Sequence, residues 1–293
     1  MGDDFFWTHL AVCTRVGGRA YSEGVSIRVA MIQLGYGDDE PVEARRQRAA
    51  GLVREQRGAD LVVLPELWAP GGFSYRDWND RTESVPGPSI DAIAAAAADI
   101  GAHVHAGCVV ESTGEHWYNT AAFLGPGGQL LATYRKVHRF GFGDGEKALL
   151  APGRDLRTID ARLGHHDVRI GLATCYDLRF PELFRGLLDR GATMLLVPAT
   201  WPMARVSAWR LFAQARAAEN QCHVVAVNTA GTHAGTQMGG HSMLVAPDGT
   251  VLAEAGVEEE VLAADIDPDE VSRLRAEFPV LADRQPATVF AAP

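Results

Sequence analysis

The sequence is poor in cysteine, and its four cysteines form no CxxC pair. They are scattered at Cys13, Cys108, Cys175 and Cys222, so neither a disulfide framework nor a zinc ribbon is indicated, and a reducing cytoplasm is the predicted compartment. The histidines have no HExxH or similar spacing, and no glycine-rich segment ends in the Lys-Ser or Lys-Thr pair of a phosphate-binding loop. We therefore expect no metal and no nucleotide or other cofactor.

Long apolar runs and excess positive charge are also missing. The alanine-rich segment at 91–100 is flanked by acidic residues and is shorter than the roughly 20 residues that span a bilayer. The net charge of −10 disfavours binding to a nucleic-acid backbone. Residues 1–24 begin with acidic residues and lack the apolar stretch of a secretory signal. We expect no membrane or nucleic-acid partner, and an N-terminal extension over 1–24.

From residue 25 onward, apolar segments and amphipathic segments alternate. The patterns predict buried strands at 25–35, 60–67, 103–111, 168–177, 192–201 and 222–231. Between them, helices are predicted at 41–59, 88–101, 180–191 and 205–221, with Ser89 as the N-cap of the second. No linker or repeat interrupts this order. The predicted organisation is one α/β domain over 25–293, with a C-terminal arm that has no periodic pattern.

Polar residues follow several predicted strands at their carboxyl ends, where α/β sheets gather reactive groups. Glu66 follows "LVVLP", Lys136 follows "LLATYR" and Cys175 follows "VRIGLAT". Thr200 and Trp201 end the segment "MLLVPATW". A thiol, a carboxylate and a cation are the groups that thiol-based acyl transfer needs, as nucleophile, base and oxyanion stabiliser.

Each of the three residues also has an ordinary structural interpretation. Cys175 could be an inert core cysteine, and Glu66 could face solvent at the end of its strand. Lys136 lies beside other basic residues and could belong to a solvated surface. For Glu146, inside the glycine-rich segment 141–155, a solvated loop acid is the simpler interpretation.

The segment "TCYDLRFPEL" favours a tight turn from strand to helix at Cys175. Backbone N–H groups at the start of the helix would favour a thiolate and so lower the pKa of the thiol. The N–H of Tyr176 would be free to bind an oxyanion. This geometry resembles a nucleophile elbow.

Three motifs together, "LPELW", "YRKVH" and "CYDLRFPEL", occur in the order and approximate spacing of the nitrilase superfamily of carbon–nitrogen hydrolases. The resemblance extends over about residues 26–290 and includes "EKALLAPG" and "GHSMLVAPDG". It implies a four-layer α-β-β-α sandwich that forms a homodimer or higher homo-oligomer. It also implies that Cys175 is the nucleophile, Glu66 the general base and acid, and Lys136 the oxyanion stabiliser. Glu146 matches a second active-site glutamate that positions the substrate and Lys136.

The residues after Cys175 are similar to those of the omega-amidase and deaminated-glutathione amidase branch. That branch implies hydrolysis of a small carboxamide, of the dicarboxylic acid monoamide type, to a carboxylate and ammonia. A carboxylate on the substrate would need a cation near the pocket, for which Arg179 and Arg205 are candidates; Arg179 could equally anchor the following helix. The alternatives are an N-carbamoyl-amino-acid or nitrile hydrolase, and a catalytically silent binding protein.

Overall fold

The computed structural model describes residues 26–141, 143 and 145–285. The predicted N-terminal extension over 1–24 lies outside the described residues, as does the last part of the predicted C-terminal arm. The division of the chain into an extension and one domain stays a prediction. None of the described helices is long and apolar enough to cross a membrane.

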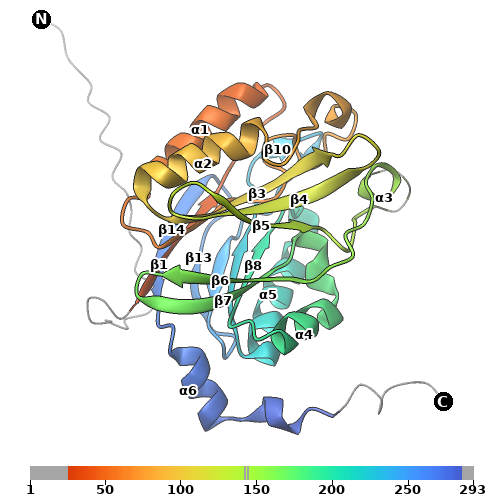
Figure 1. Ribbon diagram of the computed structural model, residues 1–293. Coiled ribbons are helices and arrows are strands. Elements are labelled where there is room, and N and C mark those ends of the chain that lie inside the picture. Colours follow the sequence, from red (N-terminus) through yellow and green to blue (C-terminus); the bar gives the residue numbers. More distant parts are fainter. Residues whose placement is uncertain (1–25, 142, 144, 286–293) are drawn as a thin grey trace, which may run out of the picture.

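Two six-stranded sheets form the centre of the molecule (Figure 1). The first sheet contains, in spatial order, β14 (Glu260–Ile266), β1 (Ile27–Gln33), β2 (Leu61–Val63), β3 (His103–Ser112), β4 (Trp117–Leu124) and β5 (Leu130–Arg135). The second contains β13 (Val251–Glu254), β12 (Met243–Val245), β9 (His223–Val227), β8 (Met194–Pro198), β7 (His166–Leu172) and β6 (Arg157–Leu163). In each sheet three parallel strands, β1-β2-β3 and β7-β8-β9, are flanked by antiparallel strands.

Helices cover the outer face of each sheet. The first sheet is covered by α1 (Val42–Arg54) and α2 (Pro88–Ile100), and the second by α4 (Pro181–Asp189) and α5 (Val206–Asn220). The remaining elements are short: α3 (Glu146–Leu149), α6 (Glu270–Glu277), the hairpin β10 (Thr232–His233) and β11 (Thr236–Gln237), and the 3-10 turns η1 (Trp78–Arg81), η2 (Cys175–Arg179), η3 (Met203–Arg205) and η4 (Val280–Asp283). The layers therefore run helix, sheet, sheet, helix, and the predicted four-layer sandwich is confirmed.

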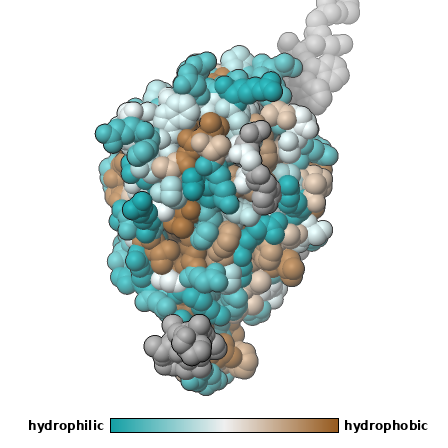
Figure 2. All heavy atoms as spheres, turned by 90° about the vertical axis from the view of Figure 1, so that its right-hand side faces the viewer, coloured by the Kyte–Doolittle hydropathy of each residue, from teal (hydrophilic) through white to brown (hydrophobic). Residues whose placement is uncertain are grey.

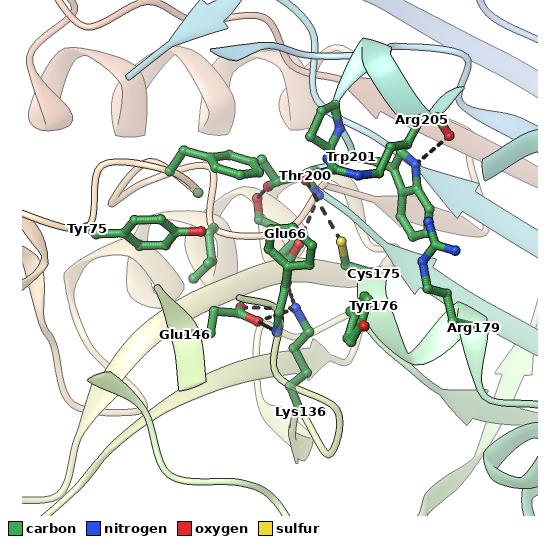
Figure 3. A pocket seen from close by; sticks show the side chains of 15 residues that line it. Glu66, Tyr75, Lys136, Glu146, Cys175, Tyr176, Arg179, Thr200, Trp201 and Arg205 are labelled. Carbon is green, nitrogen blue, oxygen red and sulfur yellow. Dashed lines mark hydrogen bonds and ion pairs between the residues drawn. The ribbon is translucent and has the colours of Figure 1, made fainter. Parts of the chain in front are cut away.

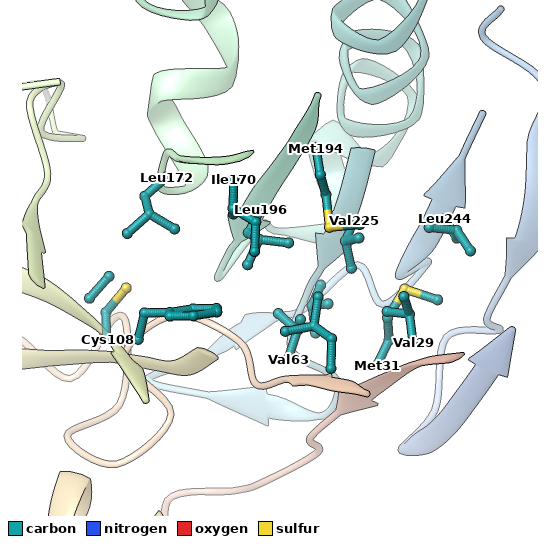
Figure 4. Close-up of a cluster of buried hydrophobic side chains, with 14 of the residues drawn as sticks. Val29, Met31, Val63, Cys108, Ile170, Leu172, Met194, Leu196, Val225 and Leu244 are labelled. Atoms are coloured by element: carbon teal, nitrogen blue, oxygen red, sulfur yellow. The ribbon is translucent and has the colours of Figure 1, made fainter. Parts of the chain in front are cut away.

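Side-chain alternation along the strands explains why two layers of core form. In β1, Val29 and Met31 point between the sheets, whereas Ala30 and Ile32 point toward α1 and α2. Figure 4 shows the cluster between the sheets, where residues of β1 and β2 face residues of β7, β8 and β9. A strand with apolar residues on both faces is buried on both, as the continuous apolar runs in the sequence predict.

A bulge in β3 brings the loop after β2 close to the sheet. The pairing of β3 with β4 shifts between His105 and Cys108, and Gly107 has a φ of 70°. A Cβ at Gly107 would lie 2.1 Å from the carbonyl oxygen of Pro65, so no side chain fits there. The Trp68 indole N–H anchors the same loop by donating to the Ala106 carbonyl at 2.9 Å. Glu66 lies in this loop, so the bulge fixes its position.

Two local predictions differ from the structure. Ser89 is not the N-cap, because α2 begins at Pro88, whose fixed φ suits the first helical position, and Gly87 precedes it. The Ser89 N–H donates to the carboxylate of Glu83 at 2.7 Å, so a side chain from the preceding loop binds an N–H group at this end of the helix. Glu146 does not lie in an irregular loop: it opens the short helix α3 and is buried.

Candidate active site

One pocket of about 410 Å³, measured out to its open mouth, contains all of the site residues expected from the sequence. Glu66 follows β2, Lys136 follows β5 directly, Cys175 follows β7 and Thr200 follows β8. The structure thus brings strand ends from both sheets to one place, where these residues line the pocket (Figure 3): Glu66, Lys136, Glu146, Cys175, Tyr176, Arg179, Thr200 and Trp201.

Two carboxylates and one ammonium form a buried cluster on one side of the pocket. The Lys136 Nζ donates to Glu66 Oε1 at 2.7 Å and to Glu146 Oε1 and Oε2 at 3.0 and 2.8 Å. All three side chains are almost fully buried, at 2–3% exposure. Burial of charges is costly unless they are paired, and here the pairing is complete for the lysine.

The pKa values of this cluster follow from burial and from the pairing. Burial alone lowers the pKa of Lys136, but the charges of Glu146 and Glu66 outweigh it and raise this pKa well above its ordinary value. Burial raises the pKa of Glu146, although Lys136 opposes the rise. Lys136 is therefore held as a cation in the resting site.

Cys175 lies at a tight turn with a strained backbone. Its φ is 47°, the left-handed region that favours glycine. The turn is held by Thr174 and Asp177: the Thr174 N–H donates to Asp177 Oδ2 at 2.9 Å, and the Asp177 N–H donates to the Thr174 carbonyl at 3.0 Å. The first N–H that bonds inside η2 is that of Asp177. The N–H of Tyr176, one residue earlier, has no partner inside the turn. The predicted elbow geometry is present.

The pKa of the Cys175 thiol is raised, whereas the sequence predicted that the start of the helix would lower it. Burial raises the pKa of Cys175 well above its ordinary value, and the neighbouring Glu66 carboxylate raises it further, while Lys136 opposes both. The Thr200 carbonyl oxygen lies 3.9 Å from Cys175 Sγ. Burial therefore favours the neutral thiol over the thiolate at Cys175.

Asp177 links the cysteine turn to the segment that follows Lys136. Its carboxylate is fully buried and accepts the His138 N–H at 2.9 Å and the Tyr134 hydroxyl at 2.7 Å. The His138 ring nitrogen Nδ1 lies 2.8 Å from the same carboxylate, and the ring stacks on Phe180 at 3.7 Å between centroids. The two segments that carry the lysine and the thiol are thereby fixed to one another.

Thr200 joins Glu66 to the second sheet. Its N–H donates to Glu66 Oε2 at 2.9 Å, and its hydroxyl donates to the Glu66 carbonyl at 2.6 Å. A Cβ at Gly72 would lie 2.4 Å from Thr200 Cγ2, so only glycine allows the Gly72 loop to pack here. Trp201 is held by a hydrogen bond from its N–H to the Asn228 side chain at 2.6 Å.

Arginine and aromatic side chains surround the mouth of the pocket. The Arg179 guanidinium lies 5.0 Å from the ring centroid of Trp201, and that of Arg205 lies 5.3 Å from that of Phe140. Figure 3 shows these two arginines on the side of Cys175 away from Glu146. Figure 2 shows apolar patches between polar side chains on the side of the molecule where Figure 1 places α3, and Leu149 of α3 is 38% exposed.

Several pocket residues were not predicted from the sequence. Phe73, Tyr75 and Phe140 line the pocket, but no sequence pattern distinguishes these aromatics from core residues. Asn119 does not line the pocket, yet its Nδ2 donates to Glu66 Oε1 and to Glu146 Oε1, each at 2.7 Å. The signal for Asn119 is an amide side chain inside the mostly apolar strand β4. Within the described part of the chain, no three His, Cys, Asp or Glu side chains are grouped as metal ligands would be.

Comparison with known families decides what this arrangement is. Residues 28–276 match the family model described as carbon-nitrogen hydrolase. The chain belongs to the carbon–nitrogen hydrolase family. The resemblance drawn from the sequence motifs is therefore confirmed, and the protein is an enzyme that hydrolyses carbon–nitrogen bonds other than peptide bonds.

Similar proteins point to one branch of this family. The chain is 41% identical to a 2-oxoglutaramate amidase of Paenarthrobacter nicotinovorans, over 90% of this chain and 91% of that protein. It is 33% identical to the human Omega-amidase NIT2, over 89% of this chain and 95% of that protein. The similarity to the omega-amidase branch is confirmed.

Solved structures of the family share the fold. XC1258 from Xanthomonas campestris, a CN-hydrolase superfamily protein with an arsenic adduct in its active site, superimposes with a TM-score of 0.80 at 30% identity. The match covers 89% of this chain and 98% of that one. A mutant of the Nesterenkonia AN1 amidase from the nitrilase superfamily has a TM-score of 0.74 at 26% identity, over 89% and 98% of the two chains.

Proposed function

We propose that this carbon–nitrogen hydrolase converts a small carboxamide that carries a carboxylate into a dicarboxylate and ammonia, through a thioester on Cys175. The observation that supports this most strongly is the meeting of the Cys175 thiol with Glu66, Lys136 and Glu146 in one pocket. The names of the relatives support the amide as substrate class, and 2-oxoglutaramate is the first compound to test.

The acylation step begins with the neutral thiol. Glu66 takes the proton of Cys175, and the sulfur attacks the amide carbonyl carbon, forming the C–S bond while the carbonyl becomes an oxyanion. The Lys136 ammonium and the Tyr176 N–H stabilise that oxyanion. Glu146, which contacts Lys136 through both carboxylate oxygens, keeps the ammonium in place.

Collapse of the tetrahedral intermediate then breaks the C–N bond. Protonated Glu66 gives its proton to the departing nitrogen, so ammonia leaves and the carboxylate of Glu66 is restored. Glu66 next takes a proton from water, and the hydroxide adds to the thioester carbonyl. Breaking of the C–S bond with return of the proton to sulfur releases the carboxylic acid and regenerates Cys175.

The mouth of the pocket supports a substrate with a charged end. Arg179 and Arg205 supply cations for a carboxylate, and Phe73, Phe140 and Trp201 supply apolar surface for the methylene groups between that carboxylate and the amide. The charged cluster of Glu66, Lys136 and Glu146 lies at the reacting end, so the two ends of the substrate meet different surroundings.

An ammonia-release screen tests this proposal. The panel contains omega-amides of dicarboxylic acids, matched amides without the acid, carbamoyl amino acids and aliphatic nitriles. We expect the acid-bearing amides to have the highest kcat/KM, and Cys175→Ala to release no ammonia while unfolding at the same temperature. Full activity of Cys175→Ala would contradict the assignment of Cys175 as the nucleophile. Release of carbon dioxide with ammonia would favour the carbamoyl alternative as substrate class, and faster turnover of nitriles would favour the nitrile alternative.

A homodimer or higher homo-oligomer, and a cytoplasmic location, stay predictions from the sequence. The resemblance to the nitrilase superfamily supports the first, and the scattered cysteines support the second. Light scattering on the purified chain measures the oligomer directly, and fractionation of the producing cells measures the location.

A further inference from the structure

Asn119 closes a ring of four hydrogen bonds behind the catalytic carboxylates. Glu66 Oε1 and Glu146 Oε1 each accept from Asn119 Nδ2 at 2.7 Å, and the same two oxygens accept from Lys136 Nζ at 2.7 and 3.0 Å. The backbone of Asn119 also takes part, because its carbonyl accepts the Lys136 N–H at 2.9 Å. One residue of β4 therefore bonds to both carboxylates and to the backbone of the residue that carries the ammonium.

The orientation of the Asn119 amide follows from its surroundings. Both neighbours are carboxylate oxygens, so the NH₂ group must face them and Oδ1 must face away. Oδ1 is buried and has no hydrogen-bond partner among the described residues. An unsatisfied buried acceptor destabilises a fold, so stability alone does not account for an amide at this position.

The charge balance of the ring makes a neutral donor important. Two carboxylates share one ammonium, and Asn119 adds a second donor without adding charge. Titratable side chains from the surrounding elements also act on these carboxylates or on the groups beside them; they are Tyr36, Tyr75, Cys108, Lys136 and Cys175. Burial raises the pKa values of the two tyrosines and the two cysteines, so these four groups are uncharged at neutral pH. Of the five groups, Lys136 is the one that carries a charge, and it contacts both carboxylates.

We propose that Asn119 is a positioning residue that keeps Glu66 and Glu146 ionised side by side, so that Glu66 can serve as the base down to a lower pH than it otherwise could. Its two N–H bonds stabilise both carboxylates in their charged form. They also occupy Oε1 of Glu66, which leaves Oε2, the atom that accepts the Thr200 N–H, as the oxygen that takes the thiol proton. The inference rests on the proposed role of Glu66.

Asn119→Leu, of similar volume but without donors, and Asn119→Asp, of the same shape, test this role. We measure kcat/KM for ammonia release from pH 4.5 to 9 on the best amide of the screen. Loss of a hydrogen bond to a charged group is expected to move the acid limb of the profile upward by about one to two pH units in Asn119→Leu. Asn119→Asp adds a third carboxylate, so its acid limb should move at least as far.

Thr120→Val is the matched control, because Thr120 is equally buried on β4 and its hydroxyl instead donates to Glu111 at 2.6 Å. An unmoved acid limb in Thr120→Val beside shifted limbs in both Asn119 variants supports the proposal. A loss of rate at all pH values with no shift of the limb overturns it, as does an equal shift in Thr120→Val. Should Asn119→Leu fail to fold, Asn119→Asp alone decides by the same criterion.

A second readout separates this inference from the substrate proposal. Alkylation of Cys175 by iodoacetamide, followed by mass spectrometry of its peptide, also needs the thiol proton to be removed but breaks no carbon–nitrogen bond, because sulfur displaces iodide at the methylene carbon. If the wild-type chain releases no ammonia from any compound, the proposed function fails, while the alkylation profile still tests Asn119. An upward shift of the acid limb of the alkylation profile in both Asn119 variants supports the positioning role. Alkylation profiles identical to that of the wild-type chain overturn it.

Discussion

The two sheets contribute unequal halves to the active site. The half from the first sheet, with Glu66 after β2 and Lys136 after β5, is buried and charged, and its charged groups are hydrogen-bonded to one another. The half from the second sheet contains Cys175, whose Sγ lies 3.9 Å from the Thr200 carbonyl oxygen, and two arginines that pack against aromatic rings at the pocket mouth.

This difference separates two tasks of a hydrolase. Groups that handle protons and developing charge work best when they are fixed before the substrate arrives. Groups that recognise the substrate must keep bonding capacity free for it. In the proposed function, the first-sheet half supplies the preorganised proton-transfer and charge-stabilising groups, and the second-sheet half supplies the nucleophile and the groups that recognise the substrate. Substitutions in the two halves should alter different kinetic constants.

The largest effect is expected for Glu66→Gln, which removes the base without changing its shape. General acid–base catalysis contributes about 10²- to 10⁴-fold, so kcat/KM should fall by that factor. Mass spectrometry after mixing with substrate should show either no acylation or an accumulated thioester. Glu259→Gln, a surface acid paired with Arg48, serves as the control. Turnover at the wild-type rate in Glu66→Gln would falsify the base assignment.

Lys136→Met should lower both activity and stability. Loss of an oxyanion donor costs about 10²- to 10³-fold in kcat. It also leaves Glu66 and Glu146 buried without their cation, which destabilises the fold by about 3–5 kcal/mol. Because an unpaired buried carboxyl group has a raised pKa, it takes up a proton as pH falls, and the stability deficit should shrink from pH 8 to pH 5. Urea unfolding at both pH values measures this, with exposed Lys147→Met as the control; a pH-independent deficit contradicts the account.

Arg179→Gln and Arg205→Gln should affect binding rather than chemistry. Loss of one charge-assisted hydrogen bond raises KM for an acid-bearing amide by roughly 10- to 100-fold, with little change in kcat. The matched amide without a carboxylate should be hydrolysed as by the wild type. Arg210→Gln, on the surface of α5 beside Glu254, is the control. Equal losses for both amides would show that the arginines support the fold instead.

The smallest effect concerns acid stability on the side of the first sheet. Burial lowers the pKa of His105, on β3, to about 4. The folded chain then binds fewer protons than the unfolded chain between about pH 4 and pH 6.5, so the free energy of unfolding should fall by about 2 kcal/mol from pH 7 to pH 5 through this residue. His105→Asn, which keeps an acceptor for the Gly107 N–H, should reduce the pH slope in urea titrations, and exposed His165→Asn should not.

Strand ends were the most predictable part of the site. The apolar pattern of segments such as 25–35 predicts the strands. The polar residues at the carboxyl ends of these strands then identified Glu66, Lys136 and Cys175 as candidates. The layering itself followed from the family resemblance and not from periodicity. The three candidates indicated a catalytic site only when they were taken together, because each of them alone has a common structural interpretation.

Contacts that depend on tertiary packing were not predictable. Asn119 reaches Glu66 because β4 pairs with β3 and the bulge in β3 at Gly107 brings in the Glu66 loop. The expected lowering of the Cys175 pKa was wrong because burial by distant segments outweighs the local turn. The burial of Glu146 at the start of α3 depends in the same way on Lys136, Asn119 and the Phe140 N–H, which donates to it at 2.5 Å.

Glu66 is held from both sides of the sandwich: Lys136 and Asn119 bind it from the first sheet, and Thr200 binds it twice from the second. Neither sheet alone can hold Glu66 in this position. During refolding, hydrolytic competence should therefore appear only when the sheets dock, and not when either one forms. A catalytic assay on this enzyme would then report the last assembly event of the fold, without any spectroscopic label.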